Sequence, residues 1–493
     1  MKGAPFRETS DSPLKSELSE NKIWLEQAIK NCGDVSVTSY HYGPELQFKA
    51  LVVYFETLVQ NQKINLLKSA LQDLSDHSVG QAADITPDEV MLYFERKGVS
   101  AQSAATIERT GQALEAILSG QVLVFFDRWN KALRFDAFSI EERTVSEPIT
   151  EPVIKGPHNS TTENLKKNAG LLRARLKTAD FKLEFVQTKG KTNTEFVFGY
   201  VEGVVDSETL CEFRKRIAPL KEQEVLGISY IEQQLEDAVY SPFPQVRWTE
   251  RPDTAVAALL QGKIIAMVSG FPAILICPGL FTEFLQSPED YYERTVFSSL
   301  TRMLRLIAFV ISLMLPSIYI ALTTFHPELI PSILLLSILN SREGIPFPSL
   351  VEAVLMEFFF ELLREAGVRL PRPTGSAVSI VGALVIGEAA INAGIASPIM
   401  VVVVALTGIA SFSLPQYSIG VAFRILRFPM MVLAATMGGF GIMIGSLLIL
   451  VHLMSLRALG QPYMSPIGPL RLREWRDVII RAPSNLRQRQ PDK

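Results

Sequence analysis

Long runs without a charged side chain constrain the last third of this chain more than any other feature. Leu306 to Phe325 is one such run, and its twenty residues match the roughly 20 that a helix needs to cross the hydrocarbon of a bilayer. Only 26 of the last 193 residues are charged, and ten of these follow Gly460. The region 296–460 is therefore predicted to be an α-helical membrane domain.

Prolines and glycines divide the rest of this apolar sequence. Pro373 to Phe423 carries a single charge, Glu388, and Pro398 lies in the middle of it. The stretch 329–341 is charge-free but only thirteen residues long, which is too short for a crossing and typical of a re-entrant or broken helix. We expect four crossings, at about 306–325, 374–395, 398–414 and 428–456, with 329–341 as a partial one.

Arginines cluster near the ends of these predicted crossings, at 302–305, 364–372 and 424–427, and seven Lys or Arg follow in the tail. With four crossings, the positive-inside rule cannot place all of these clusters on one side, because the last crossing reverses the tail. Either a crossing near 416–427 is missing from this count, or 428–456 does not simply cross. The side of the tail is left open.

Charge and motif content bound the function of the first 300 residues. They carry 32 Lys and Arg against 41 Asp and Glu, which argues against nucleic-acid binding, and the polar amino terminus lacks the apolar core of a signal peptide. The five histidines show no metal-ligand spacing, and there is no phosphate loop or nucleophile elbow. Cys32, Cys211 and Cys277 are predicted to be buried, reduced thiols. We expect no enzyme, no catalytic residue, no metal and no cofactor.

The acidic half contains an internal repeat. Residues 113–135 align without gaps with 255–276 at an offset of 142, and 50–67 align with 196–213 at an offset of 146. In the first pair, Gly120 and Gly262 coincide at the end of a predicted helix. Chance matching of apolar runs is the alternative explanation.

These patterns predict a soluble α/β N-terminal half, made of two tandem similar α/β subdomains, followed by an α-helical polytopic membrane domain. The expected regions are a polar extension (1–44), subdomain 1 (45–138), a linker with a helical segment (139–182), subdomain 2 (183–295), the membrane domain (296–460) and a basic tail (461–493).

The linker carries a basic run that includes Lys166, Arg173 and Lys177. Such a face can meet anionic lipid or nucleic acid, or it can be a solvated helix surface. The acidic balance of this half and the lack of interleaved aromatic residues favour the solvated surface.

Acidic residues in the membrane domain are the candidate functional residues. Glu357, Glu361 and Glu365 recur at spacings of four and so fall on one helix face. A ring of such faces in a symmetric oligomer would attract cations, whereas at a membrane surface the same face would pair with the clustered arginines. Glu388 lies inside an otherwise apolar crossing, where an ionisable side chain is a functional candidate by default. The candidate ion-pathway residues are Glu352, Glu357, Glu361 and Glu388.

Several sequence blocks resemble the A subunits of GerA-type spore germinant receptors from endospore-forming bacteria. They are YSPFPQVRWTERPD (240–253), LQSPEDYYER (285–294), NSREGIPFPSLVEAVLMEFFFELLREAGVRLPRP (340–373), IVGALVIGEAAINAGIASP (380–398), SLPQYSIGVAFRILRF (413–428) and QPYMSP (461–466). The N-terminal half matches in layout and at 147–176. The family pattern has glutamine where this chain has Glu388.

This resemblance implies a multi-pass protein of the spore inner membrane, in contact with lipid and assembled with a transporter-like B subunit and a lipoprotein C subunit. It implies that nutrients such as amino acids or sugars trigger germination and that monovalent cations then leave the spore core. The A subunit is expected to form a homo-oligomeric conducting pore, while the B subunit takes the nutrient.

The sequence patterns and the resemblance leave three functions open. The leading one is an ion-channel subunit that opens when a partner binds nutrient. The second is a non-conducting sensor or scaffold that couples a transporter-like partner to downstream germination proteins. The third, a secondary transporter, is indicated only by the short segment 329–341 and the glycine-broken segment 428–456, and no repeat within the membrane half supports it.

Overall fold

The computed structural model describes residues 11–42, 48–60, 62–65, 67–69, 92, 104–139, 148, 151–370, 372–470, 477–478 and 480–481, without the side chains of 368 and 372–381. The chain forms two compact units. Unit 1 comprises residues 1–153, 157–235 and 246–278, and unit 2 comprises 154–156, 236–245 and 279–493.

Unit 1 begins with an antiparallel sheet of five strands in the order β1-β2-β4-β5-β3. Its strands are rich in β-branched and aromatic residues, and helix α4 packs on β2 and β4. The central strands β2 and β4 are almost wholly buried, because the helices α1 and α4 complete the core around them. The elements are α1 (Leu18–Ala28), β1 (Val35–Tyr42), β2 (Phe48–Phe55), β3 (Ala104–Ile107), α4 (Thr110–Leu118), β4 (Gln121–Phe126) and β5 (Ala132–Asp136).

A second five-stranded sheet follows in the order β6-β7-β9-β10-β8, which is the same topology. Asn164 and Asp206 cap the first turns of α5 and α6 by accepting hydrogen bonds from backbone N–H groups. The elements are α5 (Leu165–Arg175), β6 (Phe181–Gln187), β7 (Glu195–Val201), α6 (Ser207–Ile217), α7 (Ile228–Leu235), β8 (Arg247–Thr249), α8 (Pro252–Leu260), β9 (Ile264–Val268) and β10 (Ile274–Cys277).

Strand register confirms the predicted repeat. Ala50 pairs with Phe126 in the first sheet, and Phe196 pairs with Val268 in the second. The differences are 196 − 50 = 146 and 268 − 126 = 142, which are the two sequence offsets. Gly120 and Gly262 also share left-handed φ angles of 79° and 82° at the ends of α4 and α8. The apolar runs therefore match because the two subdomains have one topology.

A buried ion pair joins the two subdomains. Arg173 of α5 donates to both carboxylate oxygens of Asp34, at 3.0 and 2.9 Å, and neither side chain is exposed. Its guanidinium lies between the rings of Phe55 and Phe181. The prediction of a solvated basic face is thus wrong for Arg173, although Lys166 and Lys177 are exposed. The sequence pattern could not place Arg173, because its partner lies in the other subdomain.

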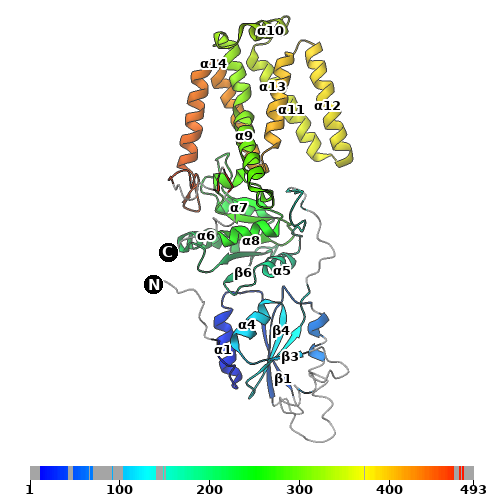
Figure 1. The fold of residues 1–493 in the computed structure, drawn as a ribbon, viewed down its shortest axis with the longest axis vertical. Helices are drawn as coiled ribbons and strands as arrows, with labels where there is room; N and C mark the ends of the chain where they lie inside the picture. The colour runs from blue at the N-terminus through cyan, green and yellow to red at the C-terminus, as the bar shows by residue number, and fades with distance from the viewer. Residues whose placement is uncertain are drawn as a thin grey trace. The chain divides into compact units, whose positions relative to one another are not determined.

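Unit 2 is mainly helical, and α9 and α14 pack side by side within one bundle (Figure 1). Two of its helices, Thr295–Thr324 and Tyr417–Ser455, are long and apolar enough to cross a membrane. The helices are α9 (Thr295–Thr324), α10 (Ser332–Arg342), α11 (Ser349–Arg369), α12 (Arg372–Asn392), α13 (Pro398–Phe412) and α14 (Tyr417–Ser455), with short 3₁₀ turns at Phe281–Leu285, Pro288–Tyr291 and Pro327–Leu329 and short strands β11 (Arg457–Ala458) and β12 (Gln461–Pro462).

Helix α14 reverses direction at Gly438, whose φ of 61° and ψ of −139° are accessible essentially only to glycine. A Cβ atom at Gly445 would lie 2.3 Å from Met430 Sδ, so the second half of α14 packs back along the first. Phe423 and His452 also contact the same ring, Phe243. The stretch 428–456 is therefore not one straight helix. A helix begins at Tyr417, in the region where the sequence left open a missing crossing.

Contacts at the two ends of the bundle show how successive helices alternate in direction. Towards one end, which we call the base, Phe309 in the middle of α9 lies edge-on to Phe423 near the start of α14. At the opposite, far end, Thr323 of α9 lies within hydrogen-bonding distance of Ser349 at the start of α11. His326, just beyond α9, accepts a hydrogen bond from the Gly439 N–H at the α14 reversal. The far end thus holds the turns that follow α9 and divide α14.

Candidate functional site: charged residues of the helical unit

The described residues contain no group of three or more His, Cys, Asp or Glu side chains placed to hold a metal ion. The charged side chains inside unit 2 are candidate functional groups, because a buried charge is costly unless it is paired. The four carboxylates singled out by the sequence lie on α11 and α12, and the structure gives each a different environment.

Glu352 lies in the first turn of α11 and is fully buried. One carboxylate oxygen accepts a hydrogen bond from the Ser397 N–H at 3.0 Å, and the other forms an ion pair with Arg342 at 2.9 Å. Ser397 in turn caps α13 by accepting from the Met400 N–H. Glu352 therefore ties α10, α11 and the start of α13 together at the far end of the bundle.

Glu357 lies farther along α11 and forms an ion pair with Arg427 of α14. Both residues are only 3% exposed. The Arg427 Nε also donates to the Ser312 carbonyl of α9 at 2.8 Å. This contact joins three helices, and the guanidinium neutralises the carboxylate inside the bundle.

Glu361 is the third carboxylate of α11, and its side chain is 44% exposed. It forms ion pairs with Arg364 on its own helix and, at 2.7 Å, with Arg424 of α14. Arg424 also stacks on the ring of Tyr417. The sequence left two roles open for this acidic face, and the geometry of Glu357 and Glu361 is that of counter-ions to arginines.

Glu388 differs from the other three. It is exposed on α12, next to exposed Leu384 and Val385, and it forms no ion pair or hydrogen bond with another described residue. Helix α12 packs chiefly on α11. An apolar helix at the edge of the bundle therefore presents one carboxylate on its open side.

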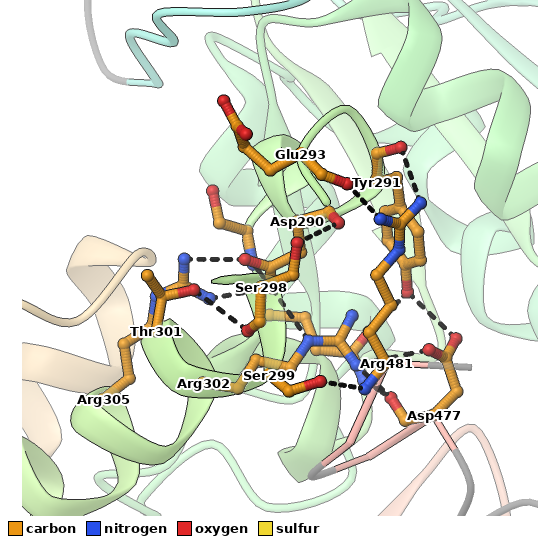
Figure 2. A network of polar contacts seen from close by, with 12 residues as sticks. Asp290, Tyr291, Glu293, Ser298, Ser299, Thr301, Arg302, Arg305, Asp477 and Arg481 are labelled. Carbon is orange, nitrogen blue, oxygen red and sulfur yellow. Dashed lines mark hydrogen bonds and ion pairs between the residues drawn. The ribbon is translucent and has the colours of Figure 1, made fainter. Parts of the chain in front are cut away.

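A second charged cluster, which the sequence analysis missed, surrounds the start of α9 (Figure 2). We use the name α9 base for this cluster, which consists of Asp290, Arg302, Arg305 and the residues that contact them. Asp290 is 2% exposed and accepts hydrogen bonds from Arg302 Nε at 3.0 Å and from both terminal nitrogens of Arg305 at 2.8 Å. It also accepts from the Ser287 N–H at 3.2 Å, which fixes the 3₁₀ turn before α9. The Ser-x-x-Asp spacing in LQSPEDYYER is the sequence signal that could have predicted this turn.

Residues far along the chain complete the α9 base. Arg302 Nη1 donates to the Asp477 carbonyl at 2.5 Å and to its carboxylate at 3.2 Å. The Tyr291 hydroxyl also donates to the Asp477 carboxylate. No local pattern could have revealed this contact, because 175 residues separate Arg302 from Asp477.

The cysteines do not all match the predicted buried thiols. Cys32 and Cys277 are buried, and burial raises the pKa of both thiols. Cys211 is exposed on α6, so the prediction is wrong there. Its position on the outer face of an amphipathic helix explains the difference, because Phe213 and Ile217 fill the inner face.

The comparisons with known proteins cover nearly the whole chain. Residues 24–493 match the family model described as Bacillus/Clostridium GerA spore germination protein. The chain is 39% identical to the uncharacterized membrane protein YfkQ of Bacillus subtilis strain 168, over 97% of this chain and 91% of that protein. It is 37% identical to spore germination protein KA of the same strain, over 97% and 87%.

A solved structure also matches the first half of the chain. It is the crystal structure of the N-terminal domain of the A subunit of the Bacillus megaterium spore germinant receptor GerK3. The identity is 27%, the TM-score is 0.43, and the match covers 55% of this chain and 98% of that domain.

Proposed function

Since the chain belongs to the GerA family of spore germination proteins, we propose that it is the A-type subunit of a nutrient receptor in the spore inner membrane and forms its cation-conducting part. In this proposal several copies assemble around a pore. A transporter-like B subunit takes the nutrient, and a lipoprotein C subunit completes the receptor.

The helical unit supports a multi-pass arrangement. We propose six crossings, made by α9, α11, α12, α13 and the two halves of α14 on either side of Gly438, with α10 as a partial one. Six crossings place Arg302 and Arg305, Arg364, Arg424 and Arg427, and the tail at the base. The positive-inside rule then assigns the base to the spore-core side. With four crossings the arginine clusters and the tail could not all lie on one side of the membrane, and six crossings remove this conflict.

The observation that carries the conducting role is Glu388 on the open side of α12. A carboxylate within an apolar helix is costly unless it faces water, protein or a counter-charge. A ring of Glu388 side chains around a water-filled axis would satisfy this requirement and attract cations. The resemblance to the family implies glutamine at this position, so a pore role that depends on the charge of Glu388 would be particular to this chain, and that charge would raise the cation flux.

A specific observation favours the second candidate, the non-conducting scaffold. Glu352, Glu357 and Glu361 are all engaged by arginines of the same chain. A pore lined by the acidic face of α11 would have to break these pairs. If copies of the chain do not open a pore, the same pairs would simply hold the bundle together.

Ion flux through the purified full-length chain in liposomes separates these candidates. We expect release of entrapped monovalent cations and a several-fold slower release from Glu388→Gln. Glu365→Gln is the matched control, because Glu365 is an exposed carboxylate of α11 paired with Arg369. Absence of flux from the wild-type chain, both alone and with the B and C subunits, would favour the scaffold.

A further inference from the structure

Three described residues of the C-terminal segment lie on the α9 base, and each makes a different kind of contact (Figure 2 shows two of them, Asp477 and Arg481). Asp477 pairs with Arg302 at 3.2 Å. Arg481 donates to the backbone carbonyls of Tyr291 and Glu293, and its own N–H donates to Ser299 Oγ at 3.1 Å. The segment therefore contacts both the turn before α9 and the first turn of α9.

Charge balance at the α9 base depends on this segment. Arg302 and Arg305 are 3% and 15% exposed and share the single buried carboxylate of Asp290. Without Asp477 the three groups would carry one uncompensated positive charge in a mostly buried setting. The Asp477 carboxylate compensates this charge directly at Arg302, so docking of Asp477 and burial of Arg302 favour each other, while the positive charge of Arg481 is bound by the Tyr291 and Glu293 carbonyls.

Apolar packing accompanies these polar contacts. Val478 lines a cavity of about 90 Å³ together with Leu285, from the 3₁₀ turn at Phe281–Leu285, and Leu306 of α9. A cavity beside Val478 leaves room for this side chain to move without breaking a close-packed core. The described residues of the segment are thus held mainly by directional polar contacts.

We propose that the described residues Asp477, Val478 and Arg481 of the C-terminal segment are an intramolecular ligand of the α9 base and act as a releasable latch. While docked, it holds the turn at Pro288–Tyr291 against the first turns of α9 and keeps the helical unit in its resting state. Release exposes Arg302, which favours a new position of α9. The latch rests on the proposed role in germination, but it does not depend on whether this chain itself conducts cations.

A disulfide lock tests the latch. Leu285→Cys and Val478→Cys are introduced together in a Cys211→Ser background, because both residues face the same cavity and Cys211 is the exposed native thiol. We expect the disulfide to form in membranes from dormant spores under mild oxidation. Locked spores should respond to nutrient about tenfold more slowly, a typical coupling between two sites, and reduction should restore the response.

Two results of this experiment would contradict the proposal. Failure of both the disulfide and a longer, reducible bis-maleimide cross-link to form in dormant membranes would overturn the docked position, and a normal nutrient response with the link intact would overturn the latch. The single-cysteine variants control for substitution alone. Because the readout is spore germination rather than liposome flux, the latch and the conducting role can fail separately.

The opposite change supplies a second arm. Asp477→Ala combined with Arg481→Ala is compared with the wild type at matched membrane abundance, because Arg302 loses a counter-charge, and it should lower the nutrient concentration needed for germination several-fold. Arg457→Ala is the matched control, since Arg457 is exposed and its side chain hydrogen-bonds only the nearby Gly460 carbonyl among the described residues. An unchanged nutrient threshold at normal abundance would count against the latch.

Discussion

At the scale of single residues, Glu357 is an acidic side chain that stabilises the helical bundle through its ion pair with Arg427. Replacing Glu357 by Gln leaves Arg427 buried without a counter-charge, which costs about 3–5 kcal/mol. We expect the membrane abundance of the chain, measured by immunoblotting, to fall. Glu365→Gln, at an exposed pair, should change it little. Normal abundance of Glu357→Gln with slowed cation release would instead support an ion-pathway role for Glu357.

Thiol reactivity is a second prediction at this scale. The thiolate is the reactive form, and burial raises the pKa of Cys32 and Cys277 while also blocking access. At pH 8 a maleimide should label Cys211 in the native protein, and Cys32 and Cys277 should react only after unfolding. Peptide mass spectrometry before and after denaturation measures this. Rapid native labelling of Cys277 would contradict its place in β10.

At the scale of elements, the reversal of α14 depends on Gly438. Alanine there must adopt a φ of 61° and place its Cβ 2.8 Å from Phe325 Cβ, so strain and overlap add. We expect Gly438→Ala to destabilise unit 2 by more than about 2 kcal/mol and to reduce its abundance in the membrane.

Gly460→Ala is the control for this prediction. Gly460 also has a positive φ, of 80°, but no other group lies within 4 Å of the position that a Cβ atom would occupy there. Its replacement therefore measures the cost of a positive φ without overlap, about 1 kcal/mol. Equal abundance of the two variants would show that the packing of Gly438 against Phe325 contributes little.

At the scale of the whole molecule, Arg173 couples the two subdomains of unit 1. Arg173→Leu leaves Asp34 buried without a counter-charge, with only the Thr57 hydroxyl still donating to its carboxylate, and should lower the unfolding midpoint of unit 1 in the full chain, for a cost of about 3–5 kcal/mol. Arg175→Leu, two positions along the same helix and exposed, should stay within about 0.5 kcal/mol of the wild type. Limited proteolysis with increasing temperature compares the two variants.

The sequence by itself determined the features that depend on the residue pattern within one segment at a time. Charge-free runs reflect the preference of each segment for lipid, and the offsets of 142 and 146 reflect two segments with the same alternation of buried and exposed strand residues. Both patterns are local, so the two α/β subdomains and the helical region could be predicted.

Only the tertiary structure decided which charges meet. Glu357 and Arg427 are 70 residues apart, Asp34 and Arg173 are 139 apart, and Arg302 and Asp477 are 175 apart. A buried charge needs a partner, but its own neighbourhood in the sequence does not say which of the many opposite charges will reach it. The partner depends on how the helices and sheets pack, and that packing assigned the acidic face of α11 to arginines and left Glu388 on the open side of α12.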